Sequence, residues 1–199
     1  MTSPAKINFK IYQGTTWEQS LRWESETKTY ATITNITKSA PVVITIGDVA
    51  KLPPIGWRVR VTNVLGMKEL NMPEGHYEIA SDIEGEAVVL NQVNSAGYSN
   101  YTGGGILEYN TPVSLGGYVA RMQVRKKLKD SEVVLSLTTE NGGITIDNLL
   151  KVIYIKATPA QTSVLNFSQA VYDLELISPT GDIIRFAEGS LTLRAEVTR

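Results

Sequence analysis

A strict alternation of apolar and polar side chains constrains this chain more than any other feature of its sequence. If residues 118–125 form an extended strand, one face carries the side chains of Tyr118, Ala120, Met122 and Val124. The other face takes Val119, Arg121, Gln123 and Arg125. Similar short segments recur throughout, separated by Gly, Pro, Asn and Asp, whereas no stretch longer than about ten residues keeps a helical period. The sequence therefore predicts an all-β fold.

The first part of the chain, INFKIYQGTTWEQSLRWES, predicts two strands over residues 7–12 and 16–23. Gln13 and Gly14 between them are typical of a tight hairpin turn. In the second strand one face would carry Trp17, Gln19, Leu21 and Trp23.

A separate run of strands is expected in the middle of the chain, over residues 31–37, 41–46, 57–64, 75–81, 86–93 and 106–110. Residues 29–111 hold 5 Lys and Arg against 8 Asp and Glu, whereas the rest of the chain holds 14 against 12. We interpret this shift as an inserted small β-barrel over residues 29–111. The host is a discontinuous β-sandwich of residues 1–28 and 112–199, with the insertion at a hairpin tip, where folding tolerates it best.

Strand patterns return after residue 115, over 116–127, 132–140, 142–148, 151–158, 170–181, 182–189 and 190–199. One short helix is expected between them, with Thr158 as its N-cap and Pro159 in its first turn.

Composition narrows the function classes. The net charge of -1 argues against a dedicated nucleic-acid binder, which usually carries a basic excess. With 0 Cys there is no disulfide framework and no thiolate site, as expected of a protein made in a reducing cytoplasm. The chain shows neither a secretory leader nor an apolar run of about 18 residues, so we expect a soluble protein that is not exported.

The stretch SLGGYVARMQVRKK, residues 114–127, is the most basic in the chain. The acidic face of the later segment YDLEL, with Asp173 and Glu175, could lie opposite Arg121 and Arg125. We favour this cross-strand pairing over the two alternatives, an interface with another subunit and a nucleic-acid site. The following lysines, at 126, 127 and 129, are expected in a solvated turn.

The sequence suggests no catalytic, cofactor-binding or metal-binding residues. The glycine-rich segment 97–105 precedes a strand rather than a helix, so we expect a surface loop and not a phosphate cradle. His76 is the single histidine, the carboxylates follow no calcium-loop spacing, and no nucleophile elbow is present. The chain therefore reads as a non-enzyme, and its tryptophans as core residues rather than sugar-stacking platforms.

Four segments together resemble the N-terminal domain of phage baseplate upper proteins and related tail-fibre attachment modules. They are IYQGTTWEQSLRW, SLGGYVARMQVRKK, VVLSLTTENGGITID and AVYDLELISPTGDIIRFAEGSLTLRAEVTR. Residues 29–111 stand where that family usually has a brief connection. They resemble a small β-barrel of phage structural proteins named after a domain of the ubiquitin-activating enzyme (FCCH-like), whose activity is not implied here.

This resemblance implies a virion protein of the phage tail, neck or baseplate, assembled in the host cytoplasm. It would act as an adaptor that forms a ring or collar with its own copies and docks fibres or baseplate components, without membrane or nucleic-acid partners. The candidate interface residues are Lys6, Gly97, Tyr98, Tyr101, Arg121, Arg125 and Arg199. Two alternatives stay open: a carbohydrate-binding module for host glycans, and a head–tail completion or capsid-decorating protein.

Overall fold

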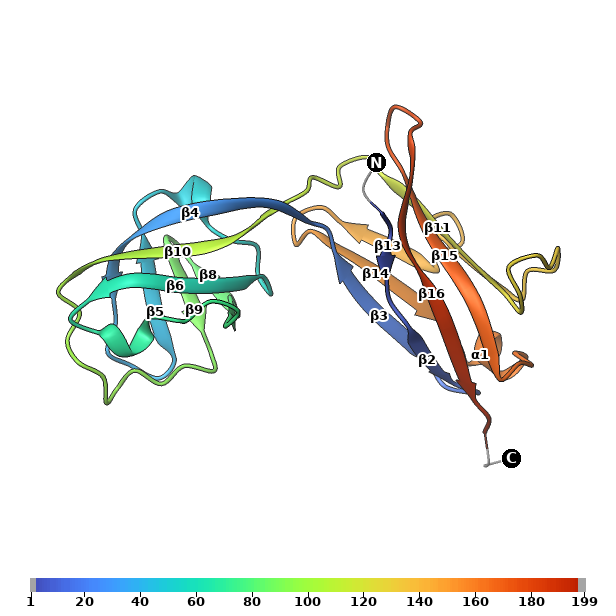
Figure 1. Ribbon diagram of the computed structural model, residues 1–199, viewed down its shortest axis with the longest axis horizontal. Helices are drawn as coiled ribbons and strands as arrows, with labels where there is room; N and C mark the ends of the chain where they lie inside the picture. Colours follow the sequence, from blue (N-terminus) through green and yellow to red (C-terminus); the bar gives the residue numbers. More distant parts are fainter. Residues whose placement is uncertain (1–2, 197–199) are drawn as a thin grey trace. The chain divides into compact units, whose positions relative to one another are not determined.

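The computed structural model describes residues 3–196, which form two compact units. One, here called the sandwich, comprises residues up to Arg22 and from Ser114 onward; the other, the barrel unit, comprises Trp23–Val113. Strands make up nearly all of the regular secondary structure in both (Figure 1), so the predicted all-β fold is confirmed.

The unit boundaries differ by a few residues from the expected 28/29 and 111/112. Strands β4 (Glu24–Ile36) and β10 (Gly103–Pro112) pair as far as Glu24 opposite Pro112. The segment ESETK lacks apolar alternation, so its strand conformation comes from this pairing rather than from its own sequence pattern.

The sandwich has a six-stranded and a three-stranded sheet. The larger sheet contains β1 (Ala5–Lys6), β2 (Phe9–Tyr12), β16 (Ile183–Arg194), β15 (Gln169–Ile177), β11 (Val119–Arg125) and β12 (Leu135–Thr138). The smaller runs in the order β13 (Ile144–Asp147), β14 (Val152–Ala157) and β3 (Trp17–Arg22). Their alternating apolar residues are buried, among them Met122, Leu174 and Ile155.

The expected hairpin of the first two strands is wrong. β2 runs parallel to β16, whereas β3 is antiparallel to β14 in the other sheet. The turn at Gly14, which has a φ of 76°, carries the chain from one sheet to the other. Residues such as Gln13 and Gly14 predict that the chain turns, but they do not determine which strands pair. Both strands here pair with strands far away in the sequence.

Two other elements refine the sequence-based expectations. Segments 182–189 and 190–199 were expected as separate strands, but β16 is one strand that passes through Gly189. The short helix is present as α1 (Pro159–Ser163), with Thr158 as its N-cap and Pro159 in its first turn, as predicted. Gln161 completes a capping box: its backbone N–H donates to the Thr158 side chain. Within residues 3–196 no helix has the length and apolarity needed to cross a membrane.

The barrel unit is a seven-stranded sheet that curls into a half-barrel, in the order β7-β6-β10-β4-β5-β9-β8. Besides β4 and β10, it contains β5 (Val42–Ile46), β6 (Arg58–Leu65), β7 (Glu78–Ile79), β8 (Asp82–Glu84) and β9 (Ala87–Leu90). Two 3-10 helices, η1 (Val49–Lys51) and η2 (Lys68–Leu70), interrupt its loops. Its core surrounds Trp57, which is fully buried and donates from Nε1 to Asn110 O at 2.7 Å.

Candidate interaction surfaces

The basic stretch is the strand β11, and its charged face pairs with β15. Arg121 lies opposite Glu175 and binds it through Nε to Oε2 at 2.7 Å, as predicted. Arg125 lies opposite Val171, and its Nη1 instead donates to the carbonyl oxygens of Asp130 and Ser131. The predicted charge pair of Arg125 is therefore wrong, because the register sets a valine against it.

The same sheet face continues onto β16, where Arg185 lies 3.6 Å from Asp173 and 3.7 Å from Glu188. Three arginines and three carboxylates thus alternate over β11, β15 and β16: Arg121, Arg125, Arg185, Asp173, Glu175 and Glu188. Because the charges balance, this face presents no concentrated positive field for a polyanion.

The other candidate interface residues are dispersed. Lys6 is exposed but belongs to β1, paired with Glu188 of β16 in the chain's own sheet. Gly97 is exposed, whereas Tyr98 and Tyr101 pack partly buried against the barrel core. Arg199 lies outside the described residues.

The segment 97–105, expected as a surface loop, is a loop only as far as Thr102, because β10 begins at Gly103. Two side-chain contacts fix this loop. Tyr101 donates from its hydroxyl to Ile33 O and to Gly104 O. Glu69 accepts from the backbone and the hydroxyl of Ser99 at 2.9 and 2.8 Å. Hydrogen bonds from its own backbone N–H and from Ser99 hold the pKa of the Glu69 carboxyl below its ordinary value.

Two of the tryptophans are buried, whereas several tyrosines are exposed. Trp17 is 5% exposed and meets Phe9 edge to face with 5.4 Å between ring centroids, as expected of core residues. Tyr30 and Tyr77 of the barrel unit are instead 54% and 46% exposed. The sequence carries no local signal that distinguishes these two exposed tyrosines among the 9 in the chain.

A charge cluster lies beside these tyrosines. Glu108 is buried, and its carboxylate accepts from Lys28 at 3.0 Å and from Arg60 at 3.1 Å. The hydrogen bond with Glu108 raises the pKa of the Lys28 ammonium above its ordinary value. Arg58 binds Glu24 at 2.8 Å and lies 5.7 Å from the centroid of the Tyr77 ring.

Most sheet edges are blunted. Asn141 closes β12: its amide donates to Ser136 O at 3.1 Å and accepts from Thr138 N at 2.8 Å, as a neighbouring strand would. On the other side of that sheet, β1 and β2 are interrupted after Lys6 and carry exposed Lys6 and Lys10. In the barrel unit the terminal strands β7 and β8 have only two and three residues, with Glu78, Asp82 and Glu84 among them.

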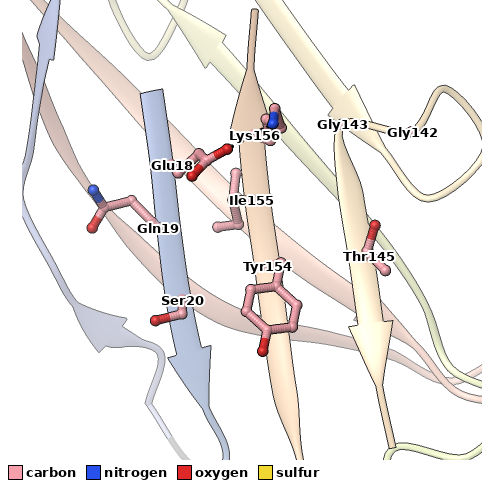
Figure 2. A pocket seen from close by; sticks show the side chains of 9 residues that line it. All are labelled: Glu18, Gln19, Ser20, Gly142, Gly143, Thr145, Tyr154, Ile155 and Lys156. Carbon is pink, nitrogen blue, oxygen red and sulfur yellow. Dashed lines mark ion pairs between the residues drawn. The ribbon is translucent and has the colours of Figure 1, made fainter. Parts of the chain in front are cut away.

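The three-stranded sheet is the exception, because neither of its terminal strands, β3 and β13, is capped in this way. Figure 2 shows the sheet face beside β3. Glu18 and Ser20 of β3 share this face with Tyr154 and Lys156 of β14, and Lys156 Nζ lies 2.7 Å from Glu18 Oε1. A hollow of about 390 Å³ covers this face and reaches Thr145 of β13. The hollow is lined by both polar and apolar groups, among them Glu18, Tyr154 and Ile155.

Residues 3–196 contain no group of three or more His, Asp or Glu side chains placed to hold a metal ion. No known protein-family model matches the sequence, and no curated protein matches it either.

Proposed function

We propose that this chain is a bacteriophage structural protein of the tail, neck or baseplate. It works as an adaptor that docks fibres or baseplate components through strand-mediated contacts. The observation that carries this proposal is the architecture: a discontinuous β-sandwich interrupted by a half-barrel, in a chain whose sandwich segments resemble those of phage attachment modules.

The means of docking would be backbone pairing at a sheet edge, supported by charged faces. An edge strand offers unpaired N–H and C=O groups, and a strand of a partner can satisfy them without any special side chain. The alternating charges of β11, β15 and β16 would then contribute to choice of partner more than to affinity.

The test is the composition and structure of purified phage particles. We expect mass spectrometry to detect this chain in particles of the phage that encodes it, and cryo-electron microscopy to place it in the tail, neck or baseplate. Density at the head–tail junction or on the capsid would favour the completion or decoration role instead. Absence of the chain from purified particles would overturn the virion proposal.

A second function, binding of host glycans, is favoured by one observation. Tyr30 and Tyr77 are both exposed; Tyr30 lies opposite Glu108 in the sheet, and Tyr77 lies against Arg58, so two aromatic faces flank a cluster of hydrogen-bonding groups. Sugar rings stack on such faces while their hydroxyls bind charged side chains. Calorimetric titration with cell-wall or lipopolysaccharide sugars tests this: binding should be lost in Tyr30→Ala and kept in Tyr12→Ala, whose exposed tyrosine lies in the sandwich.

A further inference from the structure

The free edge of β3 has a defined set of backbone groups. Lys156 N donates to Gly143 O, so Val152, Tyr154 and Lys156 of β14 bond toward β13. In an antiparallel ladder the bonding direction alternates from residue to residue, so Trp17, Gln19 and Leu21 of β3 bond to β14. The backbone groups of Glu18, Ser20 and Arg22 therefore point away from the sheet.

No residue of the described chain covers this edge at its centre. Among residues 3–196, no donor or acceptor bonds to the backbone N–H or C=O of Glu18 or Ser20. With six residues, β3 is longer than the other uncapped terminal strand of its sheet, β13, which has four. Among the terminal strands of the described sheets, β3 is therefore the longest whose edge carries neither a capping side chain nor a lysine.

We propose that β3 pairs with β3 of a second copy of this chain, antiparallel and about a two-fold axis at Ser20. This inference rests on the proposed adaptor function only in this respect: it names β3 as the sheet edge through which copies of the chain associate first. The two three-stranded sheets would join into one continuous sheet in the order β13-β14-β3-β3-β14-β13 across the pair. The facing Ser20 residues exchange two backbone bonds, and Glu18 of each copy offers its N–H and C=O to the partner's strand.

Charge complementarity selects this occupant and this register. With the axis at Ser20, Glu18 of each copy lies opposite the partner's Arg22, and Ser20 lies opposite the partner's Ser20. An axis at Glu18 or at Arg22 would instead place like charges opposite one another. A guanidinium has five N–H donors, so Arg22 can meet the partner's Glu18 while keeping its contacts within its own chain.

The strand is short, so the interface buries a small area, and we expect a dissociation constant in the micromolar range rather than the nanomolar. Such weak pairing suits an assembly step in which many copies meet at high local concentration. The closed two-fold also prevents β3 from templating open-ended strand addition.

Charge exchange is the first test, read by analytical ultracentrifugation of the full chain. Glu18→Arg and Arg22→Glu each place like charges opposite one another twice per dimer, so each should weaken dimerisation by about tenfold. The double variant Glu18→Arg with Arg22→Glu restores unlike pairs and should recover dimerisation. Lys156→Gln is the control, because it removes the Glu18 ion pair within the chain but leaves the facing charges unchanged.

A single introduced cysteine tests the register, since the natural chain has 0 Cys. Ser20→Cys places two thiols on facing residues whose Cα atoms would be about 5.5 Å apart, so a short bismaleimide should link the copies into a covalent dimer. Thr145→Cys, on the same sheet face but on β13, is the matched control. Its two thiols would be five strand spacings apart, about 24 Å, and should not be linked.

The outcomes separate this inference from the proposed function. A monomeric wild-type chain, or equal linking of Ser20→Cys and Thr145→Cys, would overturn β3 pairing while leaving a virion role intact if the chain is found in particles. A chain that dimerises through β3 but is absent from particles would overturn the virion role alone. If the double charge-exchange variant folds but does not dimerise, and Ser20→Cys is not linked either, the β3 pairing is wrong.

Discussion

The sandwich and the barrel unit end their sheets in different ways. In the barrel unit the terminal strands β7 and β8 follow one another in sequence, are two and three residues long, and carry acidic side chains. In the sandwich, β3 is six residues long and its outward backbone groups at Glu18 and Ser20 have no partner within residues 3–196. Both units are strand-rich, so it is the length and protection of the edges that decide which unit can add a strand.

The two units also differ in whether their cores are built from one continuous segment of the chain or from two separate ones. The barrel core comes from one continuous segment, Trp23–Val113, whereas the sandwich core joins residues before Arg22 to residues after Ser114. We therefore expect the barrel unit to fold as a separate cooperative unit, and the following substitutions test how far the two are independent.

The largest effect is expected from Trp57→Ala in the barrel core. Trp57 is fully buried and its indole binds Asn110 O, so the variant should lose about 3–5 kcal/mol of unfolding free energy in the barrel unit. Denaturation by guanidinium, followed by circular dichroism and by hydrogen exchange in each unit, should show an earlier barrel transition and an unmoved sandwich transition. If both transitions shift together, the two units are not independent.

Local patterns predicted much of this fold. Alternation identified β11 and β15 and placed Arg121 and Glu175 on the charged faces of their strands, because a period of two needs no knowledge of tertiary structure. The cap at Thr158 was equally local, since a capping box spans only a few residues. Such features follow from the residues themselves.

The sequence-based predictions that were wrong share one cause: they depend on pairing between residues far apart in the sequence. The strand β2 was expected to pair with its neighbour, but it pairs with β16 at the far end of the chain. Arg125 lacks its expected acidic partner because the register of β15 sets Val171 there. The open edge of β3 could not be predicted either, because an edge is defined by which strands are absent beside it, and that depends on the whole topology.

A second, smaller effect is expected where the N-terminal strand meets β16. A Cβ at Gly189 would collide with the backbone oxygen of Ile7, which also accepts from the Tyr172 hydroxyl at 2.8 Å. Gly189→Ala should therefore displace β1 and cost the sandwich about 1–3 kcal/mol. Equilibrium denaturation and hydrogen exchange of residues 5–7 measure this.

Gly97→Ala is the matched control in the barrel unit, because a Cβ there meets no atom within 4 Å. It should change stability by less than about 0.5 kcal/mol. A comparable loss in both variants would show that the contact at Gly189 is not the cause.

Opening a second sandwich edge should have an effect of about 1 kcal/mol. Asn141→Ala removes the amide that bonds Ser136 O and Thr138 N, so β12 becomes an unpaired edge. We expect a small loss of stability together with new association beyond the dimer, measured by light scattering. Asn94→Ala, which removes a bond to Ala96 N in a barrel loop, should not raise association.

The smallest effect concerns alkaline pH and a tyrosine buried in each unit. Burial, with a further contribution from the charge of Glu188, raises the pKa of Tyr172, and burial likewise raises the pKa of Tyr109 in the barrel unit. A raised pKa in the folded state stabilises the protein fully below the ordinary tyrosine pKa of about 10, and this contribution is lost as the pH rises above that value.

Tyr172→Phe should therefore cost about 0.5–1 kcal/mol at neutral pH, through the lost bond to Ile7 O, and flatten the alkaline decline of sandwich stability. Tyr109→Phe, which loses its bond to Lys51 O, should flatten only the decline of the barrel unit. Denaturation curves between pH 8 and about 11 measure both slopes, against the background of the other tyrosines. The stability of the unsubstituted unit should keep its original dependence on pH. If that dependence also changes, ionisation in one unit alters the stability of the other, and the two units are not independent.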